Sequence, residues 1–197
     1  MSASQINSPS DSSMPDYHQT QSVQYAGGVT GNGPIRMDQG SHLTPESNSQ
    51  RREIGDLAVW TLSSAKQGNG VDQLRDNETK TFWQSDGSQP HYINIQFFKK
   101  MKVSDICMYL DFKTDESYTP QKIQISVQNS FQQLQEVQTY EFNEPIGWFN
   151  FKLGQPSNLQ GSSNDDMKTS PQPYIKTMFV QIAILQNMHS GRDTHVR

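Results

Sequence analysis

The sequence predicts an all-β fold, an antiparallel β-sandwich or jelly roll with one or two short helices. Apolar and polar residues alternate with a period of two through most of the chain after residue 56, the pattern of half-buried strands. About eight short segments show this pattern, and turn-forming residues separate them. Short strands without long helical patterns are typical of two packed antiparallel sheets.

The expected elements are as follows, in chain order. Strands are expected at 57–62, 81–84, 91–98, 103–110, 121–128, 134–142, 148–153 and 175–185, and the alternation is weaker in the first two and in 134–142. A short helix is expected at 71–77. The separators are Asp86-Gly87, Lys99-Lys100, Thr119-Pro120, Asn129-Ser130 and Pro145-Ile146-Gly147, which suit turns.

One face of each strand is expected to supply the core. In 91–98, for example, Ile93 and Ile95 alternate with Asn94 and Gln96, so the apolar pair points to one side of the sheet. The same argument selects Phe97, Ile106, Met108, Leu110, Ile123, Ile125, Val127, Phe149, Phe151, Leu153, Met178, Val180, Ile182 and Ile184.

Two polar segments surround and interrupt this domain. Only 32% of the 197 residues are hydrophobic, and residues 1–50 and 154–173 are especially poor in them. Too little apolar surface is available there to offset the entropy of ordering the chain. We therefore expect a disordered tail at 1–50 and one domain at 51–197, with a flexible surface insert at about 154–173.

Several functional classes are disfavoured by composition. The net charge is −4 with no basic cluster, which argues against a nucleic-acid binder. No apolar run is long enough to span a membrane, and the N-terminus does not look like a signal peptide. Cys107 is the only cysteine, which fits a reducing compartment. No zinc spacing, phosphate-binding loop or nucleophile elbow is present, so we expect no metal and no cofactor.

Five motifs occur in an order that is specific as a set. They are Arg52-Glu53-Ile54-Gly55, Val71-Asp72-Gln73-Leu74-Arg75-Asp76, Trp83-Gln84-Ser85-Asp86-Gly87-Ser88-Gln89-Pro90-His91, Asp115-Glu116-Ser117-Tyr118-Thr119-Pro120 and Gly191-Arg192-Asp193-Thr194-His195. With the insert set aside, residues 52–197 resemble the DOC-domain family of anaphase-promoting complex subunits. That family has the galactose-binding-like (discoidin-type) jelly roll.

The resemblance implies a non-catalytic subunit of a ubiquitin ligase that acts in the cell cycle. Members of the family serve as co-receptors for the destruction-box degron, together with a separate activator protein, and they promote substrate binding and processive ubiquitination. Other subunits carry out ubiquitin transfer. The expected partners are therefore other subunits of the complex, the activator and destruction-box substrates, and the expected localisation is nuclear and cytoplasmic.

Three loops supply the residues expected to bind the degron, because loops on a rigid sandwich commonly carry binding sites. Carboxylates suit the arginine that begins a destruction box, and a tyrosine suits a rigid contact. The candidates are Ser85, Asp86, Gly87, Asp115, Glu116, Ser117, Tyr118, Asn187, His189, Arg192, Asp193, Thr194 and His195. The competing interpretations are a tight turn at 85–88, a solvated connection at 114–119 and an Asx-type turn at Asp193.

Two features depart from the family pattern. The family usually continues beyond Gly-Arg-Asp-Thr-His with a last strand and an Ile-Arg tail that docks on a tetratricopeptide-repeat scaffold, whereas this sequence stops at Val196-Arg197. We therefore expect no tail docking and an open sheet edge. His189 also lies one place out of register with the family motif. The triple replacement of Asp193, Thr194 and His195 by alanine is expected to weaken degron-dependent ubiquitination with the fold intact.

Two other functions compete with this interpretation. A discoidin-like module that binds carbohydrate or another ligand would use Trp60, Trp83 and Trp148 as platforms, although we favour core packing for these side chains. Such modules are mostly extracellular, and a sequence with a single cysteine and without the pattern of a signal peptide disfavours that location. A hydrolase would need a triad drawn from Ser85, His91, Asp193 and His195, and nothing in their spacing requires one.

Overall fold

The computed structural model describes residues 33–37, 39–40, 52–128, 134–154 and 173–197. Its larger sheet has six strands in the order β1-β7-β6-β9-β4-β2. Only β1 runs parallel to its neighbour, and the other pairs are antiparallel. The bounds are β1 Ile35–Met37, β2 Ala58–Leu62, β4 His91–Val103, β6 Pro120–Gln128, β7 Gln135–Phe142 and β9 Ile175–Asn187.

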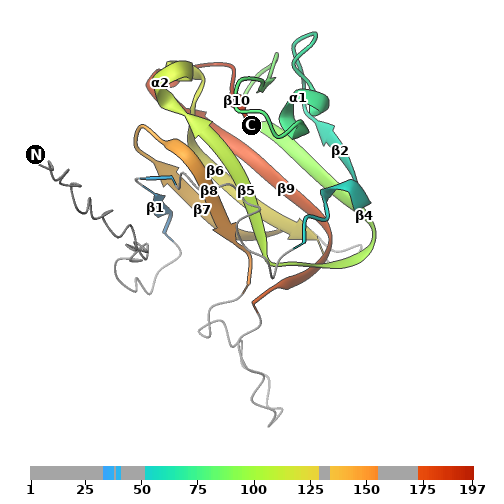
Figure 1. Cartoon of the computed structure of the whole chain (residues 1–197). Coiled ribbons are helices and arrows are strands. Elements are labelled where there is room, and N and C mark those ends of the chain that lie inside the picture. Colours follow the sequence, from blue (N-terminus) through green and yellow to red (C-terminus); the bar gives the residue numbers. More distant parts are fainter. Residues whose placement is uncertain (1–32, 38, 41–51, 129–133, 155–172) are drawn as a thin grey trace, which may run out of the picture. The chain divides into compact units, whose positions relative to one another are not determined.

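A second layer packs against this sheet (Figure 1). It consists of two antiparallel pairs, β3 with β10 and β5 with β8. The backbones of Tyr109 in β5 and Arg197 exchange two hydrogen bonds of 2.7 and 3.3 Å, which joins the pairs at one point. The bounds are β3 Trp83–Gln84, β5 Asp105–Asp111, β8 Ile146–Lys152 and β10 His195–Val196.

Short helices occupy the connections between the strands. Two are α-helical, α1 at Val71–Arg75 and α2 at Phe112–Asp115. Three are 3-10 turns, η2 at Gly55–Leu57, η3 at Glu116–Tyr118 and η4 at Met188–Ser190. Asp111 caps α2, because its carboxylate accepts hydrogen bonds from the backbone N–H and the hydroxyl of Thr114, at 3.3 and 2.9 Å. Within the described part of the chain, no helix could span a membrane.

The core lies between the two layers and confirms the predicted strand faces except near the start of β9. There Thr177 is buried, whereas Met178 is only half-buried and lies outside the apolar cluster. Ile93, Ile123 and Ile182 of the larger sheet pack in one apolar cluster with Leu110 and Phe151 of the second layer. Trp83 is also fully buried there, as the core-packing interpretation predicted. Trp60 and Trp148 are only partly buried. The predicted all-β sandwich with short helices is therefore confirmed.

Several boundaries differ from those predicted. Lys99-Lys100 is not a turn, because β4 continues through it to Val103 and accommodates a bulge between Gln96 and Met101. The helix predicted at 71–77 ends at Arg75, and α2 and η3 were not predicted. Within the predicted tail, Ile35–Met37 forms β1 along β7. Apart from residues 33–37 and 39–40, the predicted tail lies outside the described residues. The predicted turn at Asn129-Ser130 also lies outside them.

The two ends of the predicted insert lie against each other. A side-chain carbon placed on Gly154 would lie 2.5 Å from the backbone of Pro173. The segment between them, 155–172, lies outside the described residues.

Candidate functional site

Three loops meet at one end of the sandwich and form what we call the loop site, residues 85–89, 115–118 and 187–195. Gly191 approaches Ser117 so closely that a Cβ atom would lie 1.7 Å from the carbonyl oxygen of Ser117. The Met188 N–H donates to the Thr119 carbonyl at 2.8 Å. The Gln89 side-chain amide donates to the Gly191 carbonyl at 2.7 Å. All three loops predicted from the sequence are thus brought into contact.

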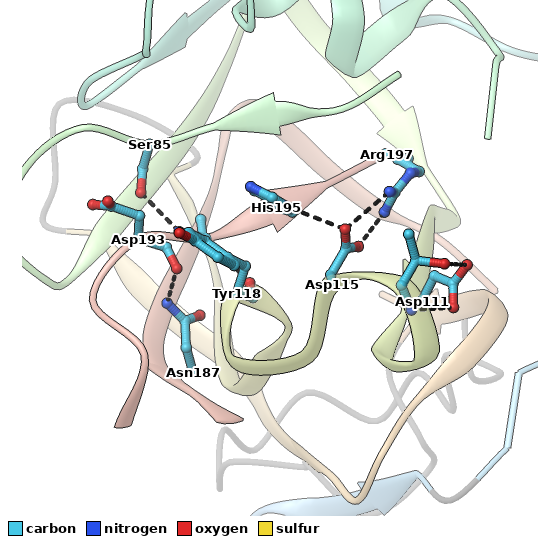
Figure 2. Close-up of polar contacts among 10 residues, drawn as sticks. Ser85, Asp111, Asp115, Tyr118, Asn187, Asp193, His195 and Arg197 are labelled. Carbon is cyan, nitrogen blue, oxygen red and sulfur yellow. Dashed lines mark hydrogen bonds and ion pairs between the residues drawn. The ribbon is translucent and has the colours of Figure 1, made fainter. Parts of the chain in front are cut away.

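A buried charged cluster fixes the base of the loop site (Figure 2). Asp115 Oδ1 accepts hydrogen bonds from His195 Nδ1 at 2.9 Å and from Arg197 Nη2 at 3.1 Å. Asp115 Oδ2 accepts a further bond from Arg197 Nη1. The side chains of Asp115 and Arg197 are only 2% and 4% exposed. Asp115 therefore links the loop after β5 to the last strand, β10.

These contacts set the charge state of Asp115. Burial by itself would raise the pKa of its carboxyl, but hydrogen bonds from His195 and Arg197 and the positive guanidinium outweigh burial and lower the pKa. Nearby, burial is the largest cause that raises the pKa of the Tyr109 phenol, and the negative charge of Asp111 adds to it. Asp115 is accordingly a stable carboxylate at neutral pH.

The lowered pKa predicts a loss of stability in acid that depends on Asp115. The contribution is fully present above the ordinary carboxyl pKa of 3.8 and disappears as the pH falls through the lower pKa of the folded state. In urea unfolding from pH 7 to pH 2, the stability difference between the wild type and Asp115→Asn should therefore shrink below about pH 4. A constant difference across this range would contradict the assignment.

His195 is clamped between two aromatic rings. Its ring stacks on Phe82 with centroids 4.0 Å apart and on Tyr118 with centroids 4.3 Å apart. The Arg197 guanidinium lies 5.1 Å from the centroid of the Phe82 ring, which extends the stack. Tyr118 stays 39% exposed. The stack therefore holds one face of Tyr118 and leaves the remainder of the side chain at the surface.

Hydrogen bonds to the backbone fix the loop before β10. The Asn187 side chain donates to the carbonyls of Asp193 at 2.8 Å and Gly191 at 3.3 Å. The Thr194 N–H donates to Ser85 Oγ at 2.9 Å, and the Ser85 N–H donates to the Thr194 carbonyl at 3.1 Å. Asn187, Thr194 and Ser85 are fully buried. These buried side chains therefore hold the backbone of residues 191–194 in place.

The predicted site residues therefore fall into two groups. Ser85, Asp115, Asn187, Thr194 and His195 are buried and bonded within the protein, and Asp86, Glu116, Tyr118, His189 and Arg192 are exposed, with Gly87, Ser117 and Asp193 between these extremes. The first group positions the second. Alanine at 194 and 195 would remove buried contacts, so the structure does not support the expectation that the triple alanine variant leaves the fold intact.

Other residues at the loop site were not predicted. Phe82 and Arg197 clamp His195 and Asp115, and Gln89 ties two loops together. Phe82 lies just before the Trp83 strand and so resembles an ordinary strand residue. Arg197 pairs with a residue 82 positions away, so no local pattern in the sequence marks it.

No catalytic triad is assembled from the four residues considered for a hydrolase. Ser85 Oγ lies 3.3 Å from His91 Nε2, but both residues are 0% exposed. His91 Nε2 also lies 2.7 Å from the Arg192 carbonyl and must carry a proton to donate to it. Among the described residues, His91 Nδ1 has no hydrogen-bond partner that would orient the ring. The pair is therefore structural.

The tryptophans do not form a carbohydrate platform. Trp83 is fully buried and donates from Nε1 to the Ser64 carbonyl at 2.9 Å. The Arg75 guanidinium covers the ring of Trp60, 4.7 Å from its centroid. Trp148 packs against Tyr109 edge-on, with centroids 5.5 Å apart. In the part of the chain that the structure describes, no group of three or more His, Cys, Asp or Glu residues could hold a metal.

Comparison with known proteins gives the identity of the family. The family of the anaphase-promoting complex, subunit 10 (APC10), matches residues 29–197. The chain belongs to the APC10 family. This confirms the resemblance seen in the sequence motifs, and the chain is accordingly a non-catalytic subunit of the anaphase-promoting complex, a ubiquitin ligase. The match also includes β1, which lies in the segment predicted to be a disordered tail.

Relatives within the APC10 family are substantially similar. Anaphase-promoting complex subunit 10 of Homo sapiens is 50% identical over 146 residues, which are 74% of this chain and 71% of the relative. The Schizosaccharomyces pombe subunit 10 is 39% identical over 154 residues, which are 78% of this chain and 75% of the relative. The similarity to these relatives covers about three quarters of this chain.

Two solved structures resemble this APC10-family chain in fold at low sequence identity. The first two CBM32 domains of Clostridium perfringens ZmpB, in complex with GalNAc, align with a TM-score of 0.57 at 10% identity, over 85% of this chain and 40% of that chain. A C. perfringens GH89 CBM32 domain, in complex with GalNAc-β-1,3-galactose, gives 0.53 at 11% identity, over 72% and 92%. The expected galactose-binding-like architecture is confirmed.

Proposed function

We propose that this chain is the destruction-box co-receptor of its complex and that the loop site contacts the degron. The observation that carries the proposal is the junction of three loops over the buried Asp115 cluster. Asp86 and Glu116 are exposed there, and Tyr118 is held at the surface by its stack on His195. A rigid surface of this kind loses little entropy when it binds an extended peptide.

The chemistry of the loop site suits the arginine of a destruction box. A guanidinium donates charge-assisted hydrogen bonds to carboxylates, and Asp86 and Glu116 offer two. The ring of Tyr118, 39% exposed in the same loop as Glu116, offers an amphipathic contact. The binding is weak on its own and gains strength from the activator protein, which holds another part of the same substrate. A longer residence of the substrate then permits processive ubiquitination by other subunits.

The same proposal covers partners and location. The chain works in assembly with other subunits of the anaphase-promoting complex, with the activator and with destruction-box substrates, in both the nucleus and the cytoplasm.

Removing the two exposed carboxylates tests this proposal. The double variant Asp86→Asn, Glu116→Gln keeps side-chain size but removes both charges, so the affinity for a destruction-box peptide should fall about tenfold, the equivalent of about 1.4 kcal/mol. The measurement is fluorescence anisotropy of a labelled peptide with the reconstituted complex and activator. Thermal unfolding should be unchanged, because both side chains are exposed.

Glu144→Gln is the matched control. Glu144 is exposed like Glu116 and has almost the same positive φ, 48° against 47°, but it lies in the turn between β7 and β8. The complex with the Glu144→Gln variant should bind the destruction-box peptide with the same affinity as the wild type. Equal affinities for the wild type and the double variant would remove the loop-site carboxylates from the proposal.

A further inference from the structure

A second exposed surface lies far along β4 from the loop site. Phe98 is 82% exposed, and Leu57 and Val59 of the neighbouring segment are 44% and 46% exposed. Exposed clusters of large apolar side chains commonly mark interaction sites. We call the three residues, together with the lysines that follow Phe98 in β4, the Phe98 surface. The lysines are Lys99, Lys100 and Lys102.

The backbone geometry explains why Phe98 points into solvent. Gln96 pairs with Phe179 of β9, but the next paired residue is Met101, opposite Thr177. Five steps along β4 therefore match two steps along β9, and the intervening residues bulge out of register with β9. On the other side, Ala58 pairs with Phe97. Val59 pairs with Gln96, and because side chains alternate across a strand, Phe98 lies on the same face of the sheet as Val59.

This surface lies at an edge of the larger sheet. Among the described residues, β2 is the last strand of that sheet, so one side of it has no strand neighbour. Exposed apolar edge strands are prone to pair with other chains, and proteins normally protect them. Phe98 is 82% exposed and lies in a bulge of β4 beside this edge. Such an exposed apolar side chain indicates a surface that binds another molecule.

The charges around Phe98 indicate the chemistry of that partner. Among the described residues, no carboxylate forms an ion pair with Lys99 or Lys100. Lys102 lies with its Nζ atom 4.6 Å from the centroid of the Tyr174 ring. The nearby carboxylates of Glu53 and Asp56 are already engaged by Arg75. On a chain with a net charge of −4, this is a locally positive, apolar surface.

We propose that the Phe98 surface docks an extended acidic segment of another subunit of the complex, with an apolar side chain of that segment against Phe98. Carboxylates on either side of the apolar contact would pair with Lys99 and Lys100. A buried aromatic residue surrounded by charges is the usual arrangement of a binding hot spot. This inference rests on the proposed function, since it assumes that the chain works inside the complex.

The Phe98 surface is separate from the loop site, so assembly and degron binding can be tested independently. His91, whose ring contacts the Arg192 carbonyl of the loop site, is seven residues before Phe98 in β4. At about 3.3 Å per residue the two lie roughly 23 Å apart along the strand. A change at Phe98 should therefore leave the loop site undisturbed.

The test measures incorporation of the full chain into an anaphase-promoting complex from which this subunit has been removed. Phe98→Ser, and separately Lys99→Glu with Lys100→Glu, should lower the apparent affinity for the depleted complex about tenfold or more. Replacement of both lysines by arginine should keep it within about twofold, because the charge stays. A photo-crosslinking amino acid at position 98 should then label an acidic segment of another subunit.

Two controls make the result specific. Ile146 is 43% exposed on β8, so Ile146→Ser removes a comparable apolar side chain elsewhere, and it should incorporate normally. All variants, as free full-length chains, should bind a destruction-box peptide like the wild type. Normal incorporation of the Phe98→Ser and lysine-reversal variants would overturn the inference, as would crosslinks to a second copy of this chain or to a segment without acidic residues.

The outcomes also separate this inference from the proposed function. If the Phe98 variants incorporate normally while Asp86→Asn, Glu116→Gln weakens degron binding, only the inference fails. If the wild-type chain does not enter the depleted complex at all, both fail. If incorporation depends on Phe98 but degron binding does not depend on the loop site, the docking surface stands and the loop-site assignment fails.

Discussion

Replacing Asp115 with alanine is expected to lower the free energy of unfolding by about 3–5 kcal/mol, the usual cost of removing one partner from a buried ion pair. The guanidinium of Arg197 is only 4% exposed and makes two hydrogen bonds to Asp115. Without the carboxylate, this charge stays buried without compensation, and His195 Nδ1 also loses its acceptor. Urea unfolding at pH 7 measures the loss.

Two matched variants separate the causes of that loss. Asp111→Ala removes a carboxylate from the same segment, but this residue only caps α2, so a cost of about 1 kcal/mol is expected. The double variant Asp115→Leu, Arg197→Met replaces the pair by apolar side chains and should recover much of the loss, because buried pairs often gain little over well-packed apolar groups. An Asp115→Ala protein as stable as Asp111→Ala would contradict the buried-pair argument.

The Asp115→Ala variant should also bind the degron more weakly, although its carboxylate does not reach the surface. Asp115 holds His195, and the ring of His195 in turn supports Tyr118. Loss of the carboxylate therefore frees a contact residue of the loop site to move, and the peptide must then restrict that motion on binding. If affinity fell while stability did not, direct contact with Asp115 would be the better explanation.

The strand faces could be predicted because each depends on local alternation. Ile123 and Ile125, for example, are buried in β6 as their spacing required. The length of β4 could not be predicted in the same way. Lys99-Lys100 looks like a break in the apolar pattern, whereas in the folded chain a bulge lets both lysines reach solvent without ending the strand.

The loops of the candidate site could be predicted from the sequence. Which of their side chains are buried and which are exposed could not. Asp115 and Tyr118 were selected together from one motif, yet one is buried and the other is exposed. The difference arises from partners far away in the sequence, His195 and Arg197. Strand β1 was missed for a similar reason, since three residues in a polar segment gain their order from pairing with β7.

The register of β8 can be tested at Phe151. This side chain is fully buried and packs edge-on against Tyr140, with centroids 4.8 Å apart. Phe151→Ala should therefore lower the free energy of unfolding by about 3–5 kcal/mol, through lost transfer energy and the cavity left behind. Ile146→Ala, on the same strand but 43% exposed, should cost no more than about 0.5 kcal/mol.

Phe151→Ala and Ile146→Ala distinguish the two registers because the side chains of a strand alternate with a period of two. A shift of one residue in β8 would move Phe149 and Phe151 out of the core and bring Asn150 and Lys152 into it. Ile146, which shares a face with Asn150 and Lys152, would also turn toward the core. Phe151→Ala would then cost little and Ile146→Ala would cost more, so the order of the two urea midpoints would be reversed. Because β8 pairs with β5, whose last residues lead into α2 and Asp115, the same shift would also displace the segment that anchors the loop site.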